Sequence, residues 1–168
     1  YFEIEGKNQL FGDITVSGAK NAVLPLMAAS ILNDRPLTIT NVPKLSDSIT
    51  MGNLIKEMGG KVSFDQSNIT INPKNLNTPY APYNLVKTMR ASFYVLGPLI
   101  AKFGEAKVSL PGGCAWGPRP VDFHLEGFKK LGIEIVLEAG YVHAKAKKII
   151  GNKIVFPKIS VGATGNVL

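Results

Sequence analysis

Three stretches of the chain carry hydrophobic side chains at the spacing of an amphipathic helix. The first places Met51, Leu54, Ile55 and Met58 at i, i+3, i+4 and i+7, which puts them on one helix face. Ser46 and Asp47 precede this stripe as candidate caps, and Gly59 and Gly60 follow it as a stop, so both ends are marked. A second stripe predicts a helix from about Asn84 to Phe103, ended by Gly104, and a third predicts a helix through Leu125, Phe128 and Leu131, ended by Gly132.

Short runs rich in β-branched and aromatic residues predict strands between these helices. They cover residues 13–16, 37–42, 61–64, 68–72, 107–110, 133–137, 141–145 and 153–156. The alternation of helices and strands favours an α/β fold.

The elements recur with a period of about 72 residues. Residues 17–24 resemble residues 161–168, with the glycines Gly18 and Gly162 separated by 144 positions, and the run Thr88-Met89-Arg90-Ala91-Ser92 lies halfway between them. The helix ends at 57–62 and 130–135 repeat at a spacing of 73. These repeats predict α/β units around a pseudo-symmetry axis. Because a third unit stops after one turn and the first residue is Tyr1, we expect a fragment of a longer protein.

Composition then narrows the class of protein. The chain of 168 residues is 45% hydrophobic and 18% charged, with a mean hydropathy of +0.12, which is typical of a globular protein. The longest apolar run falls short of the roughly 20 residues that cross a bilayer. One cysteine and two histidines exclude an internal disulfide and argue against a metal centre, so we expect neither a metal nor a cofactor. We also expect no signal peptide and a cytoplasmic location.

The net charge of +7, with a pI near 9.5, predicts an anionic partner. Nucleic acid, a membrane surface and a phosphorylated small molecule all fit a positive charge. The cations are dispersed, however, and Phe93, Phe103 and Phe128 lie at helical core spacing, where they pack and do not stack on bases. These features argue against nucleic acid, but composition alone does not choose between a membrane surface and a phosphorylated small molecule.

Residues 111–120 concentrate three glycines, three prolines, the only cysteine and the only tryptophan. This composition predicts a loop after the strand at 107–110. Cys114 has two interpretations, a small buried hydrophobe or a reactive thiol. Flanking glycines favour accessibility, and the nearby Arg119 would favour the thiolate. Trp116 either shields this loop or contacts a ligand.

Three helix starts supply polar groups at equivalent points of the repeat. Lys20 and Asn21 follow Gly18, Arg90 lies at the second junction, and Lys158, Ser160 and the backbone at Val161 lie at the third. Helix N-termini bind anions, although a solvated arginine or a capped helix would give the same pattern. We interpret Asp122 first as a cap, and we expect His124 at an exposed helix start more than as a general base.

Four ordered motifs resemble the UDP-N-acetylglucosamine enolpyruvyl transferase family. They are Gly18-Ala19-Lys20-Asn21 with Leu24-Pro25, Lys87-Thr88-Met89-Arg90-Ala91-Ser92, the Cys114 loop through Arg119-Pro120-Val121-Asp122, and Ser160-Val161-Gly162-Ala163-Thr164. The resemblance spans the whole chain but only part of a family member. It implies an inside-out α/β barrel, enolpyruvyl transferase-like, of repeated β-α-β-α-β-β units. Residues 1–19 would be a strand segment of the second domain of the full-length protein, and residues 20–168 most of one domain, truncated in its third unit.

The resemblance also implies a bacterial enzyme that transfers the enolpyruvyl group of phosphoenolpyruvate to the 3'-hydroxyl of UDP-N-acetylglucosamine and releases phosphate, the first committed step of peptidoglycan synthesis. Cys114 would be the general acid and the atom alkylated by fosfomycin. The partners implied are these two small-molecule substrates, with no nucleic acid and no membrane. Lys20 and Asn21 would bind phosphoenolpyruvate. The residues implied for UDP-N-acetylglucosamine are Arg90, Arg119, Pro120, Val121, Asp122, Phe123, Lys158, Ile159, Ser160 and Val161.

The aspartate base and a further phosphate-binding arginine would come from the missing C-terminal part of the same chain, so we expect little turnover from these 168 residues alone. The nearest alternative is the shikimate-pathway enolpyruvyl transferase, which normally has Lys-Ser in place of Lys20-Asn21 and lacks the loop cysteine. The sequence also leaves open a non-catalytic basic binding module and a structural or regulatory remnant of an enzyme.

Overall fold

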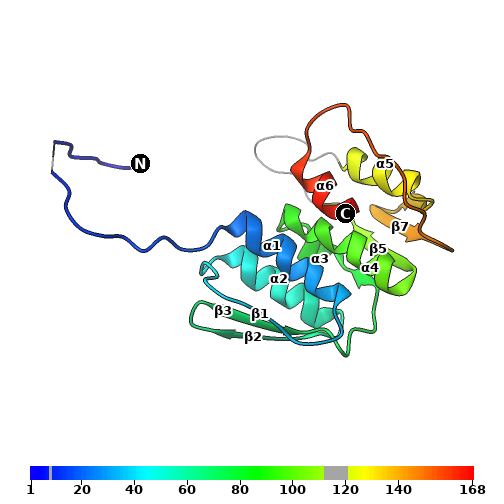
Figure 1. Cartoon of the computed structure of the whole chain (residues 1–168), viewed down its shortest axis with the longest axis horizontal. Coiled ribbons are helices and arrows are strands. Elements are labelled where there is room, and N and C mark those ends of the chain that lie inside the picture. The colour runs from blue at the N-terminus through cyan, green and yellow to red at the C-terminus, as the bar shows by residue number, and fades with distance from the viewer. Residues whose placement is uncertain (8, 112–120) are drawn as a thin grey trace.

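From Lys20 onward, the chain folds into short helices and strands (Figure 1). This structure, a computed structural model, describes residues 1–7, 9–111 and 121–168. The helices are α1 (Lys20–Ala29), α2 (Ser46–Glu57), α3 (Tyr83–Val86), α4 (Leu96–Phe103), α5 (Asp122–Lys130) and α6 (Val161–Val167), with the 3₁₀ segments η1 (Ser30–Leu32) and η2 (Arg90–Val95). The strands are β1 (Leu37–Ile39), β2 (Lys61–Asp65), β3 (Asn68–Asn72), β4 (Tyr80–Ala81), β5 (Glu105–Ser109), β6 (Glu134–Glu138) and β7 (Tyr141–Lys145).

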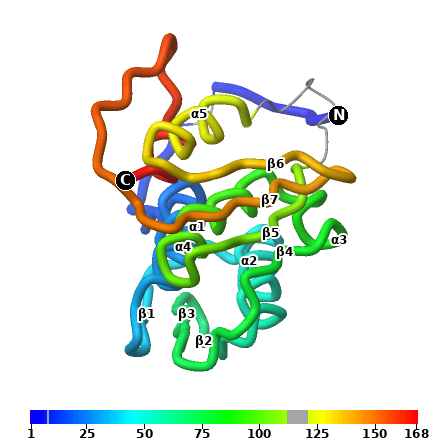
Figure 2. The backbone as a smooth tube through the Cα atoms, turned by 90° about the vertical axis from the view of Figure 1, so that its right-hand side faces the viewer, coloured from blue at the N-terminus to red at the C-terminus, as the bar shows by residue number. Residues whose placement is uncertain are grey.

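The strands form two sheets of closely related topology. The first has the order β1-β3-β2 and the second the order β4-β5-β7-β6, in which β4 pairs parallel to β5 and all other pairs are antiparallel. The hairpin β2–β3 pairs Lys61 with Asn72, and the hairpin β6–β7 pairs Glu134 with Lys145. The positions differ by 73, the spacing found in the sequence, and each hairpin follows a helix, α2 or α5. The structure therefore confirms the internal repeat (Figure 2).

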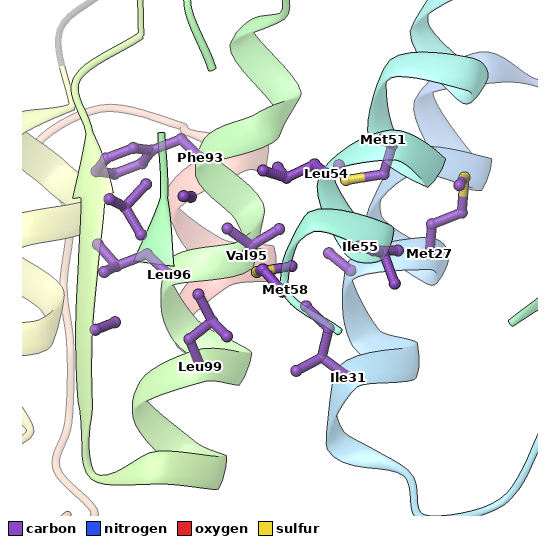
Figure 3. Packing of buried hydrophobic residues seen from close by; sticks show 14 of the residues in the cluster. Met27, Ile31, Met51, Leu54, Ile55, Met58, Phe93, Val95, Leu96 and Leu99 are labelled. Atoms are coloured by element: carbon purple, nitrogen blue, oxygen red, sulfur yellow. The ribbon is translucent and has the colours of Figure 1, made fainter. Parts of the chain in front are cut away.

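The core lies among the helices. Met27 and Ile31 from α1 and η1 face Met51 and Ile55 from α2, while Leu99 and its neighbours approach from α4 (Figure 3). Each sheet contributes one buried face, as the alternating burial of β3 shows, and exposes the other. Helices inside and sheets outside are the arrangement that an inside-out domain requires.

The predicted helix around Met51 is confirmed as α2, but its expected caps are wrong. Leu45 occupies the N-cap position and no side chain caps α2, because Ser46 and Asp47 are already helical. The predicted stops behave as expected after α4 and α5. Gly104 and Gly132 have φ values of +75° and +83°, a left-handed conformation that glycine adopts without steric cost.

The predicted helix at 84–103 is wrong in its continuity, because the structure divides it into α3, η2 and α4. Met89 is extended, with φ −143° and ψ 117°, so the backbone leaves one helix and starts another at Arg90. The apolar stripe survives the break: Val86, Phe93, Leu96 and Ile100 are all buried. The spacing of the apolar residues predicts which side chains are buried, whereas the break in the helix is a feature of the backbone that this spacing does not reveal.

Two predicted strands are absent from the described residues. Residues 13–16 and 153–156 have no pairing partner, and a strand without one leaves its backbone groups to water. The strand predicted at 37–42 ends at Ile39, and Asn41 turns the chain with φ +53°. The other strands form within two residues of their expected bounds.

The segment before Lys20 runs away from the remainder of the molecule (Figure 1). Its assignment to a second domain stays a prediction. Among the described residues, no helix has both the length and the apolar character needed to cross a membrane.

Candidate functional site

Three helical segments begin beside one another at the wall of a single cavity. The backbone is extended at Ala19 before α1, at Met89 before η2 and at Ser160 before α6, so at each point the backbone turns sharply into the helix. None of the three first turns contains an acidic residue. Free N–H groups and the helix dipole make such turns favourable for anions. The repeat thus brings the predicted junctions together.

The cavity has a volume of about 670 Å³, within the range of small-ligand sites. Its lining comes from four separate parts of the chain: the start of α1, the start of α2, the segment entering η2, and the residues around α5 and α6. The lining residues are Lys20, Asn21, Leu24, Pro25, Asp47, Thr88, Met89, Arg90, Ala91, Phe93, Tyr94, Val121, His124, Ile159, Ser160, Val161 and Gly162.

Lys20, which lines this cavity, forms an ion pair that the sequence did not reveal. Its Nζ lies 2.9 Å from Oδ2 of Asp47, and the two side chains are 45% and 27% exposed. Asp47 looked like a helix cap, and only the fold brings it beside Lys20. An ion pair this exposed contributes roughly 0 to 1 kcal/mol, so the ammonium can exchange the carboxylate for an anionic ligand.

Arg90 supplies the second cation of the lining. It is the first residue of η2 and is exposed, and in the described part of the chain it forms no ion pair. Lys20 and Arg90 against Asp47 leave one net positive charge on the described walls. A guanidinium that no carboxylate occupies can bind phosphate through two parallel hydrogen bonds.

Ser160 caps α6, as its place before Val161 suggested. Its Oγ accepts a hydrogen bond from the backbone N–H of Ala163 at 3.2 Å. The hydroxyl hydrogen stays available to a ligand, because a hydroxyl accepts and donates at the same time.

The expectation of an exposed His124 is wrong. The imidazole is buried, with an edge-on contact to Phe93 at 5.3 Å between ring centroids. Burial, with a smaller contribution from the positive charge of Arg90, lowers the pKa of His124 to about 4. The ring is therefore neutral at pH 7. The signal was present in the sequence, because His124 precedes Phe128 by four positions and shares its helix face.

Some residues implied for the substrate site do not line the cavity. Asp122 is the first residue of α5, where it is exposed and caps nothing by its side chain. Phe123 stacks on Phe156 with 5.8 Å between centroids, and Lys158 is exposed beside the chain entering α6. Cys114, Arg119 and Pro120 lie outside the described residues.

The cavity does bring together the other implied residues of the described chain, which are Lys20, Asn21, Arg90, Val121, Ile159, Ser160 and Val161. Across residues 1–7, 9–111 and 121–168, no group of three or more His, Cys, Asp or Glu side chains gathers as a metal site would require.

Comparison with known families and curated proteins gives a consistent result. Residues 4–168 match the family described as EPSP synthase (3-phosphoshikimate 1-carboxyvinyltransferase). The chain is 51% identical over 168 residues to the UDP-N-acetylglucosamine 1-carboxyvinyltransferase of Acinetobacter guillouiae, covering 99% of this chain and 40% of that protein. The protein of the same name from Psychrobacter arcticus is 52% identical over 170 residues, with 99% and 40% covered. The chain thus spans about 40% of the length of these relatives, whose name confirms the resemblance drawn from the motifs.

Solved structures agree on the fold. The enolpyruvyl transferase NikO from Streptomyces tendae superposes with a TM-score of 0.73 at 22% identity, covering 86% of this chain and 32% of that chain. An EPSP synthase from Acinetobacter baumannii gives 0.69 at 16% identity, with 94% and 37% covered. These likenesses confirm the expected enolpyruvyl transferase-like α/β architecture.

Proposed function

Because the chain belongs to the EPSP synthase (3-phosphoshikimate 1-carboxyvinyltransferase) family, we propose that it forms part of the site of an enolpyruvyl transferase whose acceptor is UDP-N-acetylglucosamine. The observation that carries this choice of acceptor is the 51% identity over 99% of the chain to relatives named for that substrate. The cavity supports it, since its walls combine two cations, an amide and a serine hydroxyl from distant parts of the sequence.

The proposed ligands present two kinds of anion to these walls. Lys20 and Asn21 would hold phosphoenolpyruvate, the ammonium pairing with its phosphate or carboxylate and the amide donating a further hydrogen bond. Arg90, Ser160 and the backbone of Val161 would hold UDP-N-acetylglucosamine. Arginine is suited to phosphate and the start of α6 to a second anionic oxygen.

The residues Cys114, Arg119 and Pro120 enter as part of the same proposal, with Asp122, Phe123 and Lys158. Cys114 would give its thiol proton to C3 of phosphoenolpyruvate while the 3'-oxygen of the sugar bonds to C2. The hydroxyl proton would pass to a base beyond these 168 residues. The bond from C2 to the phosphate oxygen then breaks, phosphate leaves with the electron pair, and C3 loses a proton to restore the double bond. Cations close to the phosphate stabilise the charge that develops.

The chain covers 40% of its relatives, and we propose that residues beyond these 168 supply the base and a further arginine. We also propose that residues 1–19 pair within a second domain, that the whole enzyme acts in the bacterial cytoplasm in peptidoglycan synthesis, and that fosfomycin alkylates Cys114. Phosphate release by the 168-residue chain alone is accordingly expected to be absent.

Calorimetric titration with UDP-N-acetylglucosamine tests the acceptor. We expect saturable binding, weakened about tenfold, or about 1.4 kcal/mol, in Arg90→Ala. Lys61→Ala, which removes an exposed cation from β2, is the matched control and should bind as the unaltered chain does. Binding of shikimate 3-phosphate in preference to UDP-N-acetylglucosamine would overturn the choice of acceptor, and equal loss in both variants would remove Arg90 from the site.

Fosfomycin labelling tests Cys114 separately. The chain has one cysteine, so an adduct measured by mass spectrometry has one origin, and Cys114→Ser should abolish it. We expect labelling to accelerate when UDP-N-acetylglucosamine is present. No adduct at saturating nucleotide sugar would contradict the role given to this thiol.

A further inference from the structure

The side chain of Asn166 is buried at the junction of three elements, behind the candidate site. It lies in α6 and is 5% exposed. Its Oδ1 accepts a hydrogen bond from the backbone N–H of Gly97 in α4 at 3.0 Å, and its Nδ2 donates to the backbone carbonyl of Phe93 in η2 at 3.0 Å. The same Nδ2 lies 3.0 Å from Nδ1 of His124 in α5. One carboxamide therefore joins η2, α4 and α5 to α6.

The two backbone contacts fix the orientation of this carboxamide. A backbone N–H can only donate and a backbone carbonyl can only accept, so Oδ1 must face Gly97 and the NH₂ group must face Phe93. The second hydrogen of that NH₂ group then points to Nδ1 of His124. A nitrogen that faces a donor must accept, so Nδ1 carries a lone pair and the ring proton of the neutral imidazole is on Nε2.

Nε2 lies close to residues that line the cavity. A Cβ atom placed on Gly162 would be 3.4 Å from Nε2 of His124 and 3.6 Å from the Tyr94 hydroxyl. His124, Tyr94 and Gly162 all line the cavity. The Nε2–H group therefore lies against the first turn of α6, next to the backbone that Ser160 caps.

From this geometry we propose that Asn166 is a positioning residue of the candidate site. Its carboxamide holds the His124 imidazole in the tautomer that carries hydrogen on Nε2, and so directs a neutral hydrogen-bond donor into the cavity beside the start of α6. The ligand chemistry that such a donor suits is an oxygen of a phosphate ester.

Among the charged groups around His124, Arg90 is the one that shifts its pKa, and it favours the same neutral state. From η2 His124 meets the Arg90 charge and the Tyr94 hydroxyl, from its own helix α5 it has Asp122 and Glu126 as neighbours in sequence, and α6 contributes no titratable side chain within Val161–Val167. Protonation would place an Nδ1–H against the amide hydrogens of Asn166, two donors facing each other. This conflict acts in the same direction as the burial and the Arg90 charge that lower the pKa of His124.

Nitrogen NMR of the 15N-histidine-labelled chain tests the tautomer directly. The sequence contains two histidines, and His143→Gln assigns the signals. We expect the His124 signals of the unaltered chain to show the Nε2–H tautomer at pH 7. An Nδ1–H tautomer or an imidazolium at that pH would overturn the proposal without any variant having to fold.

Asn166→Asp gives the second arm, because a carboxylate accepts where the amide donates. We expect the Nδ1–H form to appear and the His124 titration to move up by at least one pH unit. Asn152→Asp is the matched control: this side chain donates to the Lys130 carbonyl at 2.9 Å at the other end of α5, and its replacement adds the same charge. An equal shift in both variants, or none in Asn166→Asp, would overturn the proposal.

A binding arm relates the tautomer to the site and rests on the proposed function. At pH 7.5 the affinity for UDP-N-acetylglucosamine should fall about tenfold in Asn166→Asp and stay unchanged in Asn152→Asp. Unchanged affinity in Asn166→Asp would overturn the positioning role. If the unaltered chain shows the expected tautomer but does not bind the nucleotide sugar, the proposed function fails while the assignment of the tautomer stands.

Discussion

At the scale of single residues, Lys20 has an internal partner in the position where a ligand phosphate is proposed. Its ammonium lies 2.9 Å from the Asp47 carboxylate. Because the pair is solvated, the carboxylate holds the ammonium at the cavity without binding it strongly. Asp47 thereby reduces the positive charge offered to an anion.

Replacing Asp47 by Asn should therefore strengthen the binding of anions. We expect the affinity for inorganic phosphate or phosphoenolpyruvate to rise about two- to fivefold, with a change of less than about 1 kcal/mol in the free energy of unfolding. Calorimetry and urea denaturation measure the two quantities. Asp34→Asn is the matched control, because Asp34 forms a comparable pair with Lys102 at 3.1 Å and does not line the cavity. Weaker anion binding in Asp47→Asn would mean that the carboxylate is needed to orient Lys20.

His124 links the protonation of one residue to the stability of the fold. Its pKa falls from the ordinary 6.5 to about 4 because the ring is buried. A pKa that is lower in the folded than in the unfolded state means that the unfolded chain binds more protons between these values. The contribution is complete above pH 6.5 and is lost as the pH falls toward 4, in total about 3 kcal/mol.

Urea denaturation from pH 7.5 to 4 should show this loss. His124→Gln should lose less stability over that range than the unaltered chain, since glutamine does not titrate. His143→Gln is the control and should keep the pH dependence of the unaltered chain, because it leaves the buried His124 in place. Parallel curves for the unaltered chain and His124→Gln would contradict the assignment of a buried neutral imidazole.

At the scale of elements, the spacing of hydrophobic residues predicts correctly which side chains are buried, but it does not predict where a helix is interrupted. The stripe from Val86 to Ile100 is buried as predicted, yet the helix is interrupted at Met89. Spacing in a sequence reports which side chains share a face, and a 3₁₀ turn keeps that face nearly as well as an α-helix does. The interruption also creates the turn at which Arg90 begins η2 and lines the cavity.

The cavity residues that could be predicted from the sequence are those that belong to the internal repeat. The junctions at Lys20, Arg90 and Ser160 could be found because the same motif recurs at equivalent points of the repeat. Asp47 and Asn166 could not, because each acts across contacts between helices that are distant in sequence. Residues 13–16 and 153–156 have the β propensity of strands, but composition does not indicate whether a strand has a partner, and these have none within the described chain.

The contact between α4 and α6 depends on the absence of a side chain at Gly97. A Cβ atom there would overlap the backbone carbonyl of Asn166 and lie 2.8 Å from its Oδ1. Alanine normally stabilises a helix by up to about 1 kcal/mol relative to glycine, but here the overlap dominates. We expect Gly97→Ala to lower the free energy of unfolding by about 2 to 4 kcal/mol.

Urea denaturation at pH 7.5 measures this loss. Gly151→Ala is the control, because a Cβ atom at Gly151 has no atom within 4 Å, and it should change stability by less than about 0.5 kcal/mol. A neutral or stabilising effect of Gly97→Ala would show that α6 can move away from α4 at little cost.

At the scale of the whole molecule, the cationic side chains lie in two kinds of surroundings, the cavity and the outer surface of the sheets. Part of the +7 faces the cavity through Lys20 and Arg90, close to three helix starts. Other cations lie on the outward sheet surfaces, where Lys107 covers the rings of Tyr80 and Tyr141 at 5.7 and 4.9 Å. Dispersed surface cations favour solubility and non-specific attraction, whereas clustered ones at a cavity select a ligand.

The first sixteen residues should add nothing to the stability of the remainder. Seven large apolar side chains in this segment, from Tyr1 to Val16, are each at least 78% exposed, so their removal exposes no core. We expect deletion of residues 1–16 to change the free energy of unfolding by less than about 0.5 kcal/mol and to reduce self-association, since contiguous exposed apolar side chains promote association. Urea denaturation and light scattering measure the two effects.

The full-length variant Phe11→Ser/Ile14→Ser is the matched control and should reduce association in the same direction. A loss of more than about 1 kcal/mol on deletion would mean that the segment packs on the helices, and it would count against the expectation that residues 1–19 belong to another domain.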